Sequence, residues 1–287
     1  MLGINTNSAS LNAQMNLGKS QGSLNTSIAR LSSGLRVNSA KDDAAGLAIA
    51  SRMTAQIRGF DQAQRNANDG VSLLQVADGA MGKIGDNLQR MRELAVQAKN
   101  GTLNTTDREN LDREYQELSS EVQRIVEGSE FNGNNLFSDA NKSVTLQVGA
   151  GNAAGDSLEV NLTSNGVASG NALITLMENG ANDIVTNLGD ISTANNAETA
   201  IDELDAQIDN VTNLRATVGA GLSRLEQVSE SLQTNSANLQ SARGRIMDAD
   251  FAKETANLTR TQILQQAGTA MLAQANQIPQ NVLGLLR

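Results

Sequence analysis

Acidic side chains are the first candidates for chemistry in this 287-residue chain. Asp42 and Asp43 are adjacent, and Asp248 and Asp250 form a second pair. Carboxylate pairs can act as general acids and bases, but they usually work beside other catalytic groups. The chain has no histidine and no cysteine, so it lacks the commonest general base, the commonest metal ligand and any thiol nucleophile. We interpret these carboxylates as solvated or helix-capping residues, and we predict no enzyme, no cofactor and no metal site.

The composition favours long helices over a compact globule. Aromatic residues make up 2% of the chain and tryptophan is absent. The single proline is Pro279, where average usage would give about fourteen, and long uninterrupted helices exclude proline. The N-terminus lacks the basic-then-apolar pattern of a cleaved signal peptide, and no apolar run is long enough to span a bilayer.

The charge balance argues against a nucleic-acid partner. The chain has 22 basic and 31 acidic residues, a net charge of −9. Nucleic-acid-binding surfaces are basic, because they must neutralise phosphates.

Aliphatic residues near the C-terminal end recur at every seventh position, which is typical of one long helix that buries a stripe. A helix over residues 201–246 would span roughly 70 Å, at about 1.5 Å per residue. A second row, three residues earlier in each repeat, decays to Ser229, Ser236 and Arg243. We predict that the first row is covered within the same chain. This intrasubunit seam consists of Leu204, Val211, Val218, Leu225, Leu232, Leu239 and Ile246.

Two more helical rows are available to cover that seam. Residues 73–98 and 111–125 alternate apolar spacings of four and three. The first helix is expected from Leu47 to about Lys99. The second should begin at a capping box formed by Thr106 and Glu109, and end at Gly128. Gly219 and Gly221, inside the long seam helix, suggest a close-packed neighbour or a local bend.

The middle of the chain changes to a period of two. Val144, Leu146 and Val148 alternate with polar residues, as do residues 158–162, so we predict two short strands. Residues 149–156 would form the hairpin loop. Residues 163–198 give no clear pattern, and we interpret them as an exposed variable segment.

The two chain ends combine apolar spacing with weak helix formers. Fourteen of residues 1–40 are serine or asparagine, yet leucine and isoleucine follow helical spacing. We expect helices there that form only when packed on a partner. Gly34 should end the first helix, Ser39 and Asp42 should cap the next, and Pro279 should end the last. The predicted self-assembly residues are Leu17, Leu24, Ile28, Leu31, Leu35, Leu258, Ile263, Leu264, Leu272, Leu283, Leu285 and Leu286.

Long strings in both terminal regions closely resemble bacterial flagellins. The similarity covers roughly residues 1–140 and 197–287, and the middle matches poorly. The strings are specific because they are long: INTN from Ile4, LSSGLRVNSAKDDAAG from Leu31, QRMRELAVQ from Gln89, FNG from Phe131, QILQQAG from Gln262 and AQANQIPQNVL from Ala273.

The resemblance implies a mainly α fold: a long antiparallel helical rod or coiled coil with a small β-hairpin region. Residues 1–45 and 247–287 would pair as an inner coiled coil lining a filament channel. Residues 46–143 and 190–246 would form the rod, and residues 144–189 the hairpin and variable surface segment.

The resemblance also implies a structural subunit that self-assembles into a helical flagellar filament for motility. It would be secreted by type III export and lie in the extracellular filament. Implied partners are other copies, an export chaperone, the filament cap and hook-junction proteins, with no nucleic acid and no membrane insertion. A hook–filament junction protein and a non-flagellar signalling coiled coil are the alternatives.

Several flagellins are recognised by a Toll-like innate receptor through one helical segment. The resemblance places Gln89, Arg90, Leu94 and Glu114 at the matching positions. An alternative interpretation is that these residues form only a surface between subunits.

Overall fold

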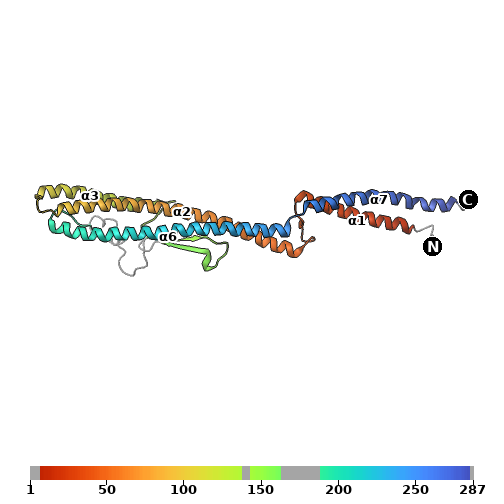
Figure 1. Ribbon diagram of the computed structural model, residues 1–287, viewed down its shortest axis with the longest axis horizontal. Coiled ribbons are helices and arrows are strands. Elements are labelled where there is room, and N and C mark those ends of the chain that lie inside the picture. Colours follow the sequence, from red (N-terminus) through yellow and green to blue (C-terminus); the bar gives the residue numbers. More distant parts are fainter. Residues whose placement is uncertain (1–6, 138–142, 163–187, 285–287) are drawn as a thin grey trace. The chain divides into compact units, whose positions relative to one another are not determined.

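The computed structural model describes residues 7–137, 143–162 and 188–284, and it is mainly α-helical, which confirms the predicted fold class. Among the described helices, short segments connect α1 to α2, α2 to α3 and α6 to α7, whereas the strands lie between α3 and α6 (Figure 1). In chain order the elements are α1 (Ser8–Ser33), α2 (Ala44–Ala98), α3 (Thr105–Gly128), β1 (Glu130–Phe131), β2 (Asn134–Asn135), β3 (Ser143–Gln147), the 3₁₀-helix η1 (Ala154–Asp156), β4 (Ser157–Asn161), α6 (Ala194–Met247) and α7 (Phe251–Gly284).

The chain divides into two compact units. The terminal unit comprises Met1–Ile57 and Ala237–Arg287, and the central unit comprises Arg58–Ser236. The sequence places its domain boundaries near residues 45 and 247, close to the start of α2 and the end of α6. The two units instead divide inside α2 and α6. Both helices continue without a break through the division, so no local sequence signal marks it.

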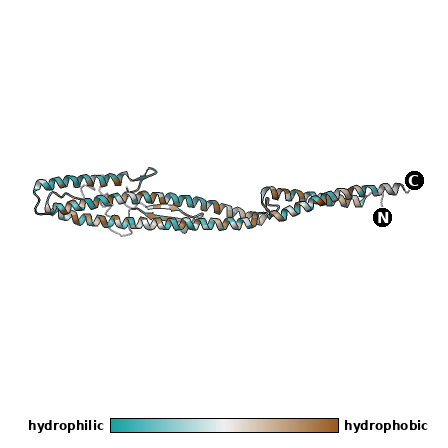
Figure 2. Ribbon diagram, turned by 45° about the horizontal axis from the view of Figure 1, so that its top comes forward, coloured by the Kyte–Doolittle hydropathy of each residue, from teal (hydrophilic) through white to brown (hydrophobic). Residues whose placement is uncertain are grey.

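The core of the central unit lies between α2, α3, α6 and the β3–β4 hairpin. Met81, Ile84 and Leu88 of α2 are fully buried, as is Tyr115 of α3. Figure 2 shows apolar and polar residues mixed along every helix. One stripe of each helix is therefore buried, and the remaining faces are exposed to water. Among the described residues, no helix is long and apolar enough to cross a membrane.

The predicted hairpin is confirmed. β3 and β4 pair antiparallel, with Val144 opposite Val160 and Leu146 opposite Leu158. The hairpin packs directly on helix backbone where glycine allows it. A Cβ at Gly59 would lie 2.6 Å from Ala150 Cβ. A Cβ at Gly221 would lie 3.3 Å from Val160, so the close-packed neighbour expected there is present.

Gly34 ends α1 as predicted, but the next helix begins differently. Gly34 adopts a left-handed conformation with φ of 70°, and its amide donates to Arg30 O at 2.8 Å. Asp43, not Ser39, caps α2, because its carboxylate accepts the Gly46 amide at 2.8 Å. Ser39 and Asp42 close the turn that precedes the helix, with the Ser39 hydroxyl donating at 2.9 Å.

The predicted boundaries of α3 are also corrected. Asn104 is the N-cap, and it forms a capping box with Asp107 rather than the expected pair Thr106 and Glu109. Asn104 and Thr106 are both acceptable capping residues, so spacing alone did not separate them. α3 does end at Gly128, but the C-cap is Ser129 in extended conformation, so no left-handed glycine closes it.

The prediction that Pro279 ends the last helix is wrong, because α7 continues past it to Gly284. Proline removes one amide donor, but its fixed φ of about −65° lies in the helical range. The chain can therefore stay helical at the loss of one backbone hydrogen bond.

A hydrogen bond from Tyr115 joins α3 to the segment that precedes α6. Its buried hydroxyl donates to Leu188 O at 2.7 Å. Nearby, the Ile191 amide donates to Asp112 Oδ1 at 2.9 Å. Burial raises the pKa of the Tyr115 phenol well above its usual value, and the charge of Glu203 adds to this effect.

Replacing Asn104 by alanine should lower the free energy of unfolding by about 1 kcal/mol, because it removes the capping acceptor. Thr106→Ala is the control and should have a much smaller effect, because Thr106 lies inside the first turn. Urea denaturation followed by circular dichroism measures both. Equal losses would contradict the assignment of the cap.

Stability should decline above about pH 10, where an unfolded chain ionises Tyr115 and the folded chain does not. A raised folded pKa means that this contribution is present at lower pH and is lost as pH rises. Tyr115 is the only tyrosine and tryptophan is absent, so phenolate absorbance reports it directly. Tyr115→Phe should show a shallower decline in stability above pH 10. An ordinary titration of Tyr115 in the folded chain would contradict the prediction.

Candidate assembly interface

The terminal unit contains a pair of antiparallel helices, α1 and α7. Three contacts fix their alignment along most of their length. Asn7 Nδ2 donates to Ala275 O at 2.7 Å, and Ser10 Oγ donates to Asn276 Oδ1 at 2.9 Å. Far along the pair, Arg30 Nη1 lies 4.0 Å from Glu254 Oε2. From Asn7 to Arg30 the residue numbers rise, whereas those of their partners fall from Ala275 to Glu254, so the two helices are antiparallel.

The connectors of the terminal unit bond to each other through backbone groups. The Arg36 amide donates to Met247 O at 2.6 Å, and the Ala249 amide donates to Gly34 O at 2.9 Å. A β-bridge joins Leu35 and Asp248. The chain entering α2 and the chain leaving α6 are therefore tied at the base of the α1–α7 pair.

The inside of this pair is made of small and polar residues. The buried residues of its two helices are Ser10, Ser27, Glu254, Thr261 and Ala275. The carboxylate of Glu254 is only 7% exposed, and Arg30 is the basic side chain that approaches it. Leucines of both helices, such as Leu17 and Leu258, are half-buried beside these residues, so a single copy covers the apolar side chains of the pair only in part.

The outside of the pair carries large apolar side chains in water. We call them the terminal apolar set. Each is exposed by 49% to 66% of its surface: Leu11, Met15, Ile28, Phe251, Ile263, Leu264 and Met271. In the described part of the central unit, the exposed large apolar residues are Val76, at 43%, and Val96, at 50%.

The predicted self-assembly residues fall into three groups. Ile28, Ile263 and Leu264 belong to the terminal apolar set. Half-buried residues are Leu17, Leu24, Leu31, Leu35, Leu258 and Leu272. Leu283 lies in α7 but its side chain is outside the described residues, as are Leu285 and Leu286.

The sequence reasoning missed Leu11, Met15, Phe251 and Met271 as site residues. Leu11 and Met15 are four residues apart, a helical spacing that was available in the sequence. They lie outside the leucine row at 17–35, which its helical spacing predicts as part of the assembly interface. The leucines at positions 17–35 are half-buried, whereas Leu11 and Met15 of the same helix are exposed.

The comparisons with known proteins match this arrangement of terminal helices. The bacterial flagellin N-terminal helical region matches residues 4–142, and the bacterial flagellin C-terminal helical region matches residues 201–286. The chain belongs to the bacterial flagellin family. It is a structural subunit of the flagellar filament.

Relatives of similar length share the whole chain. A flagellin of Halalkalibacterium halodurans is 45% identical over 284 residues, covering 99% of both chains. The flagellar filament 33 kDa core protein of Treponema phagedenis is 40% identical over 289 residues, with the same coverage. A solved flagellar hook-associated protein of Vibrio parahaemolyticus has a TM-score of 0.55 at 16% identity, covering 72% of this chain and 100% of its own. That likeness concerns the fold alone.

The seam residues of this flagellin lie mainly in the core of the central unit. Leu204, Val211, Val218, Leu225 and Leu232 are all at most 6% exposed. Leu239 and Ile246, in the terminal unit, are half-buried. The decaying second row is also half-buried at Ser229 and Arg243, but Ser236 is buried and donates to Asp61 Oδ1 at 3.3 Å.

Ion pairs hold α2 and α6 in register along this seam. Arg215 Nε lies 2.9 Å from Asp78 Oδ1, and Lys99 Nζ lies 3.1 Å from Glu198 Oε1. Arg92 donates two hydrogen bonds to Asp205, which lower the pKa of that carboxyl. All these groups are substantially exposed, so each pair contributes little free energy but opposes a shifted alignment.

Three of the four receptor-type residues lie on the surface. Gln89, Arg90 and Glu114 are exposed, and Arg90 Nη2 lies 2.7 Å from Glu114 Oε1. Arg90 also pairs with Glu93 at 2.9 Å. Leu94 is 1% exposed, because it packs into the core of the central unit. The assignment of Leu94 to a receptor-facing surface is therefore corrected.

The acidic pairs serve as local hydrogen-bond acceptors. Hydrogen bonds from Ser39 lower the pKa of Asp42, and Asp43 caps α2. Asp250 Oδ1 accepts the Ala252 and Lys253 amides at the start of α7. Within the described residues, no group of three or more acidic side chains is placed to hold a metal ion.

Proposed function

We propose that the terminal apolar set forms the main contact between copies of the chain in the filament. The observation that supports this is the inverted packing of the α1–α7 pair. Small and polar residues lie inside, and residues such as Phe251 (66% exposed) and Met271 (62% exposed) lie outside. Each fully buried aliphatic side chain gains about 1.5–3 kcal/mol, and that gain is available only when another copy covers it.

The contact between copies would be heterologous. A head-to-tail contact whose rotation does not close produces an open helical polymer. The chain ends, at residues 1–45 and 247–287, would then form the inner coiled coil that lines the filament channel.

The setting and the remaining partners follow from membership of the family. The subunit would be exported unfolded by a flagellar type III apparatus and would assemble outside the cell. An export chaperone, the filament cap and the hook-junction proteins would be its other flagellar partners. We propose a purely structural, non-enzymatic role, since the carboxylates that could do chemistry already serve as caps and turn acceptors.

Recognition by a Toll-like receptor is a second function that one surface feature favours. Arg90 projects from α2 and binds Glu93 and Glu114, so a cation and two anions are presented together across two helices. The side chains of this network are 47% to 69% exposed. A receptor would read this charged surface in the monomer.

Replacing Ile263 by serine should raise the critical concentration for polymerisation about tenfold or more, because it removes roughly 1.5 kcal/mol or more of apolar burial per copy. Ala273→Ser, an equally exposed change on α7, is the control. Growth on short seeds, followed by electron microscopy and sedimentation, measures the effect. Unchanged polymerisation of Ile263→Ser would contradict the proposal, and failure of the unaltered chain to form long filaments would favour a junction protein.

Arg90→Ala should strongly reduce receptor signalling by the monomer while leaving filament growth intact. Arg124→Ala is the matched control, because Arg124 is also an exposed arginine paired with a glutamate. Reporter cells carrying the receptor measure the signal. If Arg90→Ala and Arg124→Ala signal as strongly as the unaltered chain, this charged surface is not the recognition site.

A further inference from the structure

One exposed row of α7 combines cations with apolar side chains. Its residues follow spacings of seven, four, three and four, so they lie along one face of the helix. Within it, Leu264 is 49% exposed and Met271 is 62% exposed. We call this row the α7 outer row. It consists of Lys253, Arg260, Leu264, Ala267 and Met271, all of them exposed.

The two cations of the α7 outer row are unpaired. Neither the Lys253 nor the Arg260 side chain forms an ion pair or a hydrogen bond with any residue that the structure describes. Arg90 and Arg124 of the central unit, in contrast, each bind a glutamate. The α7 outer row therefore presents two cations that are available to an external anion.

The α1–α7 pair has little negative charge of its own. Its two helices carry four basic residues and one acidic residue, so 4 − 1 gives a net charge of +3. The acidic residue is Glu254, which is 7% exposed and lies beside Arg30. Asp250, just before α7, accepts the Ala252 and Lys253 amides. No exposed carboxylate within the two helices as described therefore opposes an approaching anion.

The charge of the whole chain directs an anionic partner to this pair. The terminal unit has 10 basic and 5 acidic residues, a net charge of +5, whereas the central unit has 12 basic and 26 acidic residues, a net charge of −14. An extended anionic surface is attracted to the terminal unit and repelled by the central unit.

A partner for the α7 outer row must accept cations and apolar side chains on one surface. The interface of an anionic bilayer does so, because headgroup phosphates lie next to acyl chains. Lysine and arginine reach phosphates while their stems stay in apolar surroundings. Nucleic acid would neutralise Lys253 and Arg260 but would leave Leu264 and Met271 without apolar contacts, so it fits the row less well.

We propose that the α7 outer row of an unassembled copy binds the surface of an anionic lipid bilayer. Lys253 and Arg260 contact headgroup phosphates, and Leu264 and Met271 enter the boundary with the acyl chains. The helix lies along the surface. The inference goes beyond the proposed function and does not depend on it, because a single copy is sufficient for binding.

Sedimentation of the full-length chain with lipid vesicles tests this, at protein concentrations below those that support filament growth on seeds. Mixed vesicles of phosphatidylcholine and phosphatidylglycerol should bind the chain. Vesicles of phosphatidylcholine alone should bind it about tenfold more weakly or less, and added salt should weaken binding to the mixed vesicles. Equal binding to both kinds of vesicle would overturn the inference.

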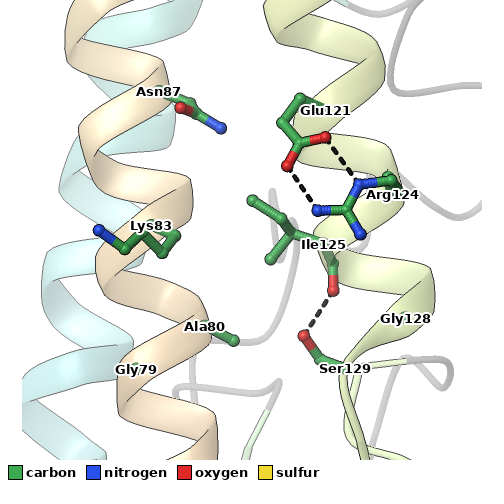
Figure 3. Close-up of a pocket in the computed structure, with 9 residues that line it drawn as sticks. All are labelled: Gly79, Ala80, Lys83, Asn87, Glu121, Arg124, Ile125, Gly128 and Ser129. Carbon is green, nitrogen blue, oxygen red and sulfur yellow. Dashed lines mark hydrogen bonds and ion pairs between the residues drawn. The ribbon is translucent and has the colours of Figure 1, made fainter.

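The double variant Lys253→Gln, Arg260→Gln should bind the mixed vesicles about tenfold more weakly, because each cation near an anionic surface adds to the attraction. Its matched control is Lys83→Gln with Arg124→Gln, which removes the same charge from the central unit. Figure 3 shows Lys83 on α2 and Arg124 on α3, where Arg124 binds Glu121. The control should bind like the unaltered chain. Equal losses in both double variants would mean that net charge alone matters, and the row would have no special role.

The double variant Leu264→Ser, Met271→Ser tests the apolar part of the contact. It should also weaken binding to the mixed vesicles about tenfold, because it removes the apolar area that enters the lipid. Ala273→Ser, at another exposed position of α7, is its control. Undiminished binding of the Leu264→Ser, Met271→Ser chain would reduce the contact to adsorption by charge and contradict the proposal.

The inference and the proposed function fail in different ways. A chain that forms filaments but ignores the mixed vesicles refutes the lipid contact and leaves self-assembly standing. A chain that binds the vesicles but never polymerises does the reverse. If the chain sediments equally without vesicles, it binds other copies under these conditions, and the lipid contact is wrong.

Discussion

In the terminal helices several large apolar side chains are exposed, while the most deeply buried side chains are small or polar. A single copy therefore leaves apolar surface of this helix pair in water. Ser10, Ser27 and Thr261 occupy the inside of the α1–α7 pair, while Leu11, Ile263 and Met271 face water. Ordering the backbone costs about 1–2 kcal/mol per residue. Half-buried leucines such as Leu17 and Leu258 offset only part of that cost within one copy, which agrees with the proposal that other copies supply further burial.

In the central unit, by contrast, large apolar side chains are buried within the same chain. Its helices bury a continuous aliphatic seam that includes Leu74, Leu88 and Leu204, and the hairpin adds Leu158 and Val160. Cross-helix ion pairs such as Arg92 with Asp205 set the alignment at the surface. The chain thus combines a part whose apolar side chains are buried within one copy with a part that, on the proposed function, is completed by assembly.

The same logic separates the residues of the proposed recognition surface from the residues that support it. Arg90 and Glu114 are joined across α2 and α3 on the surface, while Leu94, one turn away on α2, is packed in the core. Sequence similarity alone treats all three as one motif. Their burial assigns Leu94 to holding the helix in place and leaves the charged pair available to a partner.

The sequence by itself determined the helices, the hairpin and the family, because each depends on local pattern. Period seven gave the α6 seam, period two gave the strands around Val144 and Val160, and long terminal strings gave the resemblance to flagellins. Gly34 ended α1 because its left-handed conformation is a local preference.

Only the tertiary structure decided which cap was used, which face was covered and which glycines were required. Asn104 and Thr106 each precede an acidic residue by three positions, and the structure shows that Asn104 is the cap. Leu17 and Ile263 have similar hydrophobicity, yet one is half-buried and the other exposed. Gly221 and Gly79 look alike in sequence, but only Gly221 has a neighbour at van der Waals distance. Burial is a property of what lies opposite a residue, and in an α1–α7 pair lined by serine and threonine that information is absent from any single helix.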